Sequence, residues 1–135
     1  MDRKEKEMKR KSMFLVLLVL CITACGPMYE YRHLDGHWQM RQITYSNGET
    51  KKAEDIYYGF QLHLINIRNL NTGSYFGDFT YVGDSLHVRI VGAPSQEAMH
   101  SYGMNDTLQR FKVDIPNGDK LILQSDYARL EFRKY

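Results

Sequence analysis

Apolar and polar residues alternate with a period of two along much of the chain beyond its first quarter. The clearest runs cover residues 85–90, 110–115 and 127–133. In a half-buried antiparallel strand every second side chain faces the core, so this period predicts strands and not helices. The pattern therefore predicts an all-β domain.

Turn signals separate these runs at spacings that suit hairpins. Asn117–Gly118 is the strongest signal, because both residues tolerate a positive φ, and Gly83–Asp84 divides another pair of runs. Together the signals predict seven strands, with an eighth candidate around residues 51–58. The segment 60–67 is predicted as a single strand whose buried face switches near Leu64, through a bulge or complete burial.

One segment, residues 93–103, lacks the alternation. Ser95 is suited to cap a helix of one or two turns, which Gly103 would end. Consecutive hairpins with one short helical insert predict a small antiparallel up-and-down β-barrel, with a β-sandwich as the alternative. Closure into a barrel removes the exposed strand edges that a short domain would otherwise have to protect.

The first 24 residues have the pattern of a secretory signal peptide. Six Lys or Arg residues among the first twelve precede ten unbroken apolar residues at 13–22. Ten residues form about 15 Å of helix, half of the roughly 30 Å hydrocarbon core of a bilayer. The apolar segment is therefore too short to span the hydrocarbon core as a helix.

The residues after this segment indicate the type of signal. Ile22-Thr23-Ala24-Cys25 resembles the lipobox of bacterial lipoproteins, in which small residues let the peptidase reach the bond before a cysteine. The resemblance implies that Cys25 carries a thioether-linked lipid that anchors the chain to a membrane. The expected organisation is a signal peptide at 1–24, a tether at 25–34 and a barrel domain at 35–135.

The residue after the cysteine is Gly26, not the aspartate that retains lipoproteins at the inner membrane of enterobacteria. The expected location is therefore the cell envelope, at its outer membrane. The other cysteine, Cys21, would leave with the signal, so the mature chain is expected to form no disulfide.

Cleavage also changes the charge of the chain. The signal holds six of the 18 basic and three of the 16 acidic residues, which leaves twelve and thirteen. A nearly neutral domain lacks the basic surface that nucleic acids require, so no nucleic-acid partner is expected.

The segment Gly36-His37-Trp38 resembles the Gly-x-Trp start of lipocalins and related calycin barrels. In that family the glycine permits a tight start to the first strand, and the tryptophan closes one end of the barrel. The resemblance implies that Arg129 or Arg133 of the last strand stacks on the indole, a cation–π contact worth about 0.5–2 kcal/mol. Residues 34–135 look like the small lipocalin-like lipoproteins of the bacterial envelope, whose function is uncharacterised.

No residue pattern indicates catalysis. The mature chain would have no thiol, and the sequence has no Gly-x-Ser-x-Gly motif, Gly-rich phosphate loop or readable acid/base pair. No two histidines have a spacing that would present both imidazoles together, although His63 and His87 could meet through the fold. We therefore expect no enzyme activity, no catalytic residue, no cofactor and no metal.

Tyrosine is the one clear compositional excess, with ten residues in the chain. Tyrosines could fill the faces of a small barrel, or they could form an aromatic binding pocket or patch. The candidate residues for such a pocket are Tyr57, Tyr58, Phe60, Tyr75, Phe76, Phe79 and Tyr81.

Two functional hypotheses follow from these aromatic residues. In the first, the barrel binds a small apolar or amphipathic ligand. In the alternative, the barrel is filled by its own side chains, and its exterior binds an envelope protein or a glycan. A cavity of about 300 Å³ or more, lined by these aromatics, would favour the first hypothesis, and a filled interior would favour the second.

Overall fold

The computed structural model describes residues 33–135, and the predicted signal peptide and most of the predicted tether lie outside them. No helix in this described part is long and apolar enough to cross a membrane. The elements are β1 (Gly36–Tyr45), β2 (Thr50–Lys52), β3 (Ile56–Gln61), β4 (Leu64–Asn69), β5 (Gly73–Val82), β6 (Ser85–Ile90), α2 (Gln96–His100), β7 (Leu108–Asn117), β8 (Lys120–Gln124) and β9 (Ala128–Lys134).

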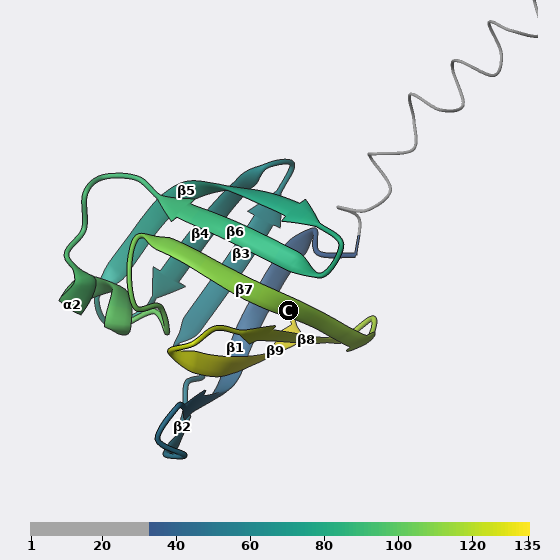
Figure 1. Ribbon diagram of the computed structural model, residues 1–135, viewed down its shortest axis with the longest axis horizontal. Helices are drawn as coiled ribbons and strands as arrows, with labels where there is room; N and C mark the ends of the chain where they lie inside the picture. The colour runs from purple at the N-terminus through teal and green to yellow at the C-terminus, as the bar shows by residue number, and fades with distance from the viewer. Residues whose placement is uncertain (1–32) are drawn as a thin grey trace, which may run out of the picture. The chain divides into compact units, whose positions relative to one another are not determined.

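These strands form one antiparallel sheet that closes on itself (Figure 1). From β3 to β9 each strand pairs with the next strand along the chain, and β1 pairs with both β3 and β9 to close the barrel. The short β2 pairs only with the second half of β1 and lies outside the ring of eight strands. The predicted up-and-down barrel with one short helical insert is confirmed.

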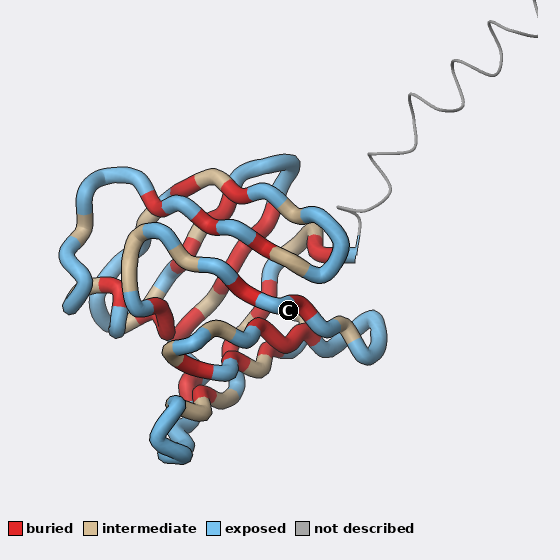
Figure 2. Tube along the Cα trace, viewed as in Figure 1, coloured by how far each residue is buried: buried red, intermediate tan, exposed pale blue. Residues whose placement is uncertain are grey.

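The core lies inside the barrel and follows the alternation of the sequence. In β6, Leu86, Val88 and Ile90 are buried while the residues between them are exposed. Figure 2 shows the same alternation of buried and exposed positions along the other strands of the wall. The period of two therefore exists because one face of each strand packs into a shared interior.

One strand prediction is wrong. Residues 60–67 do not form a single strand, because the chain turns at Leu62 and His63 and separates β3 from β4. The buried face switches at this point because the chain reverses direction there. The φ of Leu62 is 56°, in the left-handed region that favours glycine, so the sequence carries no ordinary turn signal at this position.

The barrel has two rims, which differ in what they carry (Figure 1). The N-terminal rim holds the start of β1, the β3–β4, β5–β6 and β7–β8 turns and the C-terminal Tyr135. The helix rim holds α2, the β1–β2 turn, the β4–β5 turn and the β8–β9 turn. Ser95 caps α2 as predicted, since its side chain accepts a hydrogen bond from the Ala98 amide.

Candidate functional site

Trp38 closes the N-terminal rim. Its side chain is completely buried, and its indole N–H donates a hydrogen bond to the carbonyl oxygen of Leu34 at 2.8 Å. Lys134 lies over the ring, with Nζ 4.5 Å from the ring centroid. The same Nζ donates to the carbonyl oxygen of Asp35 at 2.5 Å, so the last strand is fastened to the start of the first.

The cation on the indole is therefore Lys134, which corrects the expectation that Arg129 or Arg133 fills this role. Both arginines are exposed, and Arg129 is within 3.5 Å of Glu131. Gly36 does have a specific role, since its φ is +117° and a Cβ there would lie 2.7 Å from Lys134 Nζ. A glycine at this position therefore leaves room for the lysine that covers Trp38.

The helix rim is closed by the insert that contains α2. Met99, Tyr102 and Met104 are buried, so the insert fills the mouth of the barrel with its own side chains. The Tyr58 hydroxyl donates to the Tyr102 carbonyl oxygen at 2.5 Å, and the Tyr102 hydroxyl donates to the carbonyl oxygen of Gly73 at 2.9 Å. Burial raises the pKa of Tyr58, which keeps this hydroxyl protonated as a donor.

The structure separates the seven aromatic residues proposed as a pocket. Five of them have inward-facing positions: Tyr58, Phe60, Tyr75, Phe79 and Tyr81. The other two face outward. Tyr57 contacts Arg68 and Tyr135, while Phe76 is among the most exposed large apolar residues. The set therefore does not line one pocket.

The inward rings contact one another inside the barrel. Ring centroids lie 4.8 Å apart for Tyr58 and Phe132, 5.3 Å apart for Phe60 and Phe79, and 5.5 Å apart for Tyr75 and Tyr102. A side chain that lined a cavity large enough for a ligand would expose surface to it, whereas Trp38, Tyr58 and Ile67 expose none. Around these residues the interior is filled by side chains, as in a small barrel packed to normal protein density.

A small hollow remains at the helix rim, outside the closed mouth. Its volume is about 260 Å³, and it lies between β2, the β4–β5 turn and the end of α2. Ile43 and Ile56 contribute apolar surface, and the charged or basic side chains of the lining are Lys51, Lys52 and His100 together with one carboxylate, Asp55. Both lysines are exposed, and neither has an ion-pair partner among residues 33–135.

A larger groove of about 510 Å³ lies on the outer wall, across β1, β3, β4 and β5. Gly59 is part of its lining, between the outward-facing His37 and Asn66 of the neighbouring strands. A Cβ at Gly59 would lie 3.1 Å from His37 Nδ1, so the absent side chain opens the groove. Exposed Leu64 and Phe76 contribute apolar surface beside these polar groups.

The groove continues into a band of exposed apolar residues on the outside of β4 to β7. Leu64, Phe76, Val91 and Leu108 are each at least half exposed. Their order in space follows the register, because Leu64 is opposite Asp78, Asp78 is opposite Arg89, and Arg89 is opposite Leu108. The Val91 amide, in turn, donates to the carbonyl oxygen of Phe76. We call these four residues the apolar band.

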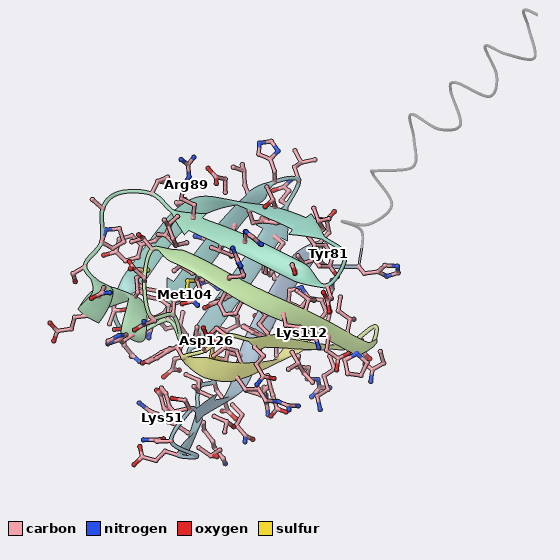
Figure 3. The ribbon with its side chains drawn as sticks, viewed as in Figure 1. Lys51, Tyr81, Arg89, Met104, Lys112 and Asp126 are labelled. Atoms are coloured by element: carbon pink, nitrogen blue, oxygen red, sulfur yellow. The ribbon has the colours of Figure 1, made fainter. Side chains whose placement is uncertain are left out.

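An ion pair lies within the apolar band. Arg89 Nη2 donates to Asp78 Oδ2 at 2.6 Å, and the arginine projects away from the wall (Figure 3). This hydrogen bond holds the pKa of Asp78 below its usual value. Both side chains are well exposed, so the pair gives the band a fixed polar element without stabilising the fold much.

Most of this surface is not among the residues that the sequence predicts for a binding site. Phe76 is one of the aromatic candidates, but Leu64, Val91 and Leu108 are not. The sequence does contain a sign of this surface, because these apolar residues occupy positions that the alternation assigns to the outer face. Leu108, for example, is an even-numbered position in β7, whose buried residues Phe111 and Val113 are odd-numbered. An apolar residue on the predicted outer face indicates a contact surface when several such residues adjoin.

The sequence matches a known protein family. The family model of the lipocalin-like domain matches residues 19–135, which is most of the chain. The chain belongs to the lipocalin-like domain family. Proteins with a lipocalin-like barrel are of a ligand-binding type and are generally non-catalytic.

Solved structures from two Bacteroides species are similar to this lipocalin-like barrel. A lipocalin-like protein from Bacteroides uniformis is 24% identical, with a TM-score of 0.66 over 76% of this chain and 99% of that one. An uncharacterized protein from Bacteroides eggerthii is 27% identical, with a TM-score of 0.62 over 75% and 98% of the two chains. No curated protein sequence matches the chain.

No cluster of three or more His, Cys, Asp or Glu side chains within residues 33–135 could hold a metal ion. His63 and His87, the pair that could meet through the fold, lie on the two sides of β5. The Phe79 amide donates to the His63 carbonyl oxygen, and His87 of β6 is opposite Thr80.

Proposed function

We propose that this lipocalin-like protein is a non-catalytic lipoprotein of the bacterial cell envelope that binds a partner protein on the outside of its barrel. The observation that carries the proposal is the groove on the outer wall, with its continuation into the apolar band. An interior filled by side chains supports the same choice, because it leaves the outer surface as the larger binding area.

Membrane attachment is proposed from the sequence around Cys25. The lipobox-like segment before this residue is followed by a tether of ten residues, 25–34, that leads into the barrel. Two or more acyl chains hold a protein on a membrane stably, whereas a single chain gives marginal binding. The proposed location is the outer membrane, since Gly26 follows the lipidated cysteine.

The proposed partner is a protein because of the size and chemistry of the surface. Exposed apolar patches bordered by polar groups are typical of protein interfaces, and four large apolar residues extend past the groove itself. A partner segment with apolar side chains and polar groups at its border would complement this surface.

The anchoring part of the proposal is tested by Cys25→Ala. Wild-type protein should incorporate labelled palmitate and sediment with the membranes, because the lipid is attached through the Cys25 thiol. The Cys25→Ala variant should lose the label and leave the membrane fraction. Cys21→Ala serves as the matched control and should leave both properties unchanged. Wild-type protein without label, or a variant that stays in the membrane pellet, would contradict the anchor.

The binding part is tested by photo-crosslinking in the host cell. A photoreactive p-benzoyl-phenylalanine in place of Phe76 should give discrete crosslinked products of defined mass, because Phe76 lies at the centre of the proposed surface. The same group in place of Gln124, an exposed residue of β8 on the other side of the barrel, is the control. Adding Leu64→Ser and Leu108→Ser should weaken the crosslink at position 76. Equal crosslinking at positions 76 and 124 would contradict a specific surface there.

A second candidate function is favoured by the hollow at the helix rim. Its apolar floor and its basic side chains suit a small amphipathic anion, and its volume of about 260 Å³ limits the ligand to a small one. A small molecule that copurifies with the protein from its host, and is lost from a Lys51→Gln, Lys52→Gln variant, would favour this function over the partner protein.

A further inference from the structure

The N-terminal rim presents large apolar side chains at two separate turns. Leu62 in the β3–β4 turn is 64% exposed, and Val82 at the end of β5 is 73% exposed. Neither residue belongs to the apolar band on the wall. Turns usually carry small or polar residues, so two apolar tips on one rim require an explanation.

Leu62 also has an unfavourable backbone conformation. With a φ of 56°, the residue occupies a conformation that glycine adopts easily and leucine adopts at a cost. Because the side chain points into solvent, its burial within the domain does not offset that cost. The turn therefore holds an exposed leucine where the fold alone would favour glycine.

Charge divides the two rims in a way that favours the N-terminal rim as a membrane contact. The helix rim carries six acidic and four basic residues: Glu49, Glu54, Asp55, Glu97, Asp106 and Asp126, with Lys51, Lys52, Arg68 and Arg129. The N-terminal rim carries three acidic and three basic residues: Asp35, Asp84 and Asp119, with Lys120, Arg133 and Lys134. An anionic bilayer surface would repel the helix rim and would not repel the N-terminal rim.

From these observations we infer that the N-terminal rim rests on the bilayer, with Leu62 and Val82 inserted among the lipid headgroups. The inference rests on the proposed lipid at Cys25. A tether of ten residues spans at most about 36 Å, and it joins the domain at this same rim, so the rim can reach the surface. The leucine and valine side chains would enter the apolar boundary of the bilayer.

The test uses full-length lipidated protein in vesicles of phosphatidylethanolamine and phosphatidylglycerol. Since Cys25 would be blocked by its lipid, a Leu62→Cys or Val82→Cys variant offers a single thiol for a polarity-sensitive fluorophore. Leu70→Cys is the matched control, because Leu70 is an equally apolar turn residue, 59% exposed, on the helix rim. Far-UV circular dichroism confirms that each labelled variant is folded.

Labels at positions 62 and 82 should shift their emission to shorter wavelength, be quenched by spin-labelled lipid and be protected from iodide in the water. The label at position 70 should show none of these effects. Protein that carries the lipid and floats with the vesicles, but whose three labels respond alike, would overturn this inference and leave the anchor intact. Protein that lacks the lipid and does not float would overturn both.

Discussion

The Trp38→Ala variant should lose about 3–5 kcal/mol of its free energy of unfolding, the usual cost of truncating a buried tryptophan. The loss has three physical sources. The indole is completely buried, its N–H bonds to the Leu34 carbonyl, and its face supports Lys134. Removing the ring would leave a cavity at the N-terminal rim and a lysine without its aromatic partner.

Urea unfolding followed by far-UV circular dichroism measures this change without the tryptophan signal. Domains of this size have a total stability of only about 5–15 kcal/mol, so the variant loses a large share of it and should unfold at a clearly lower urea concentration than the wild type. Trp38→Phe retains an aromatic ring and should lose less. A loss for Trp38→Ala within about 0.5 kcal/mol, the range of surface substitutions, would contradict the structural role. Wild-type fluorescence offers an independent check, since a buried Trp38 should emit at shorter wavelength than indole in water.

The Tyr102→Ala variant should also lose about 3–5 kcal/mol, because Tyr102 fills the opposite end of the barrel. Its ring is 1% exposed and packs edge-on against Tyr75. Its hydroxyl accepts from Thr72 and donates to Gly73, which ties the insert to the β4–β5 turn. The truncation removes the ring together with these bonds and opens a cavity under the insert.

Two control variants separate the contributions of Tyr102 in the same unfolding experiment. Tyr102→Phe removes only the hydroxyl and should lose about 1–2 kcal/mol, since each of its two hydrogen bonds has a usual net worth of about 1 kcal/mol. Tyr135→Ala removes an exposed tyrosine and should lose much less than Tyr102→Ala. If Tyr102→Ala unfolded at the same urea concentration as Tyr135→Ala, the insert would not be a structural plug.

The sequence predicted the strand architecture because a single physical cause dominates it. In β6 and β9 the core lies on one side only, so burial leaves a period of two that can be read directly. The helix of the insert was predictable for a different local reason, the capping side chain of Ser95. Both signals are local, and neither depends on which strands become neighbours.

The residues that close the barrel and those that form its outer surface depend on which strands are paired and in what register. The sequence does not show this pairing. Trp38 is predictable as a buried residue, but the choice of Lys134 over an arginine follows from the register of β1 against β9, where Trp38 and Lys134 are paired. Tyr75 and Phe76 are consecutive aromatic residues, so composition alone could not tell which one faces inward. The pairing of Tyr75 with the buried Ile67 decides it.

One fluorescence titration tests directly whether the barrel interior is closed to ligands. An apolar naphthalene dye that entered the barrel would lie close to Trp38, the sole tryptophan, and would quench its emission by energy transfer. The titration uses the Leu64→Ser, Leu108→Ser variant, which removes apolar surface from the outer wall where the dye could also bind. We expect this variant to show no saturable transfer, and the further change Tyr102→Ala to create it, because apolar cavities made by truncation bind apolar molecules. Saturable one-to-one binding of the dye without Tyr102→Ala, with quenching of Trp38, would contradict the filled interior and return the function to ligand binding inside the barrel.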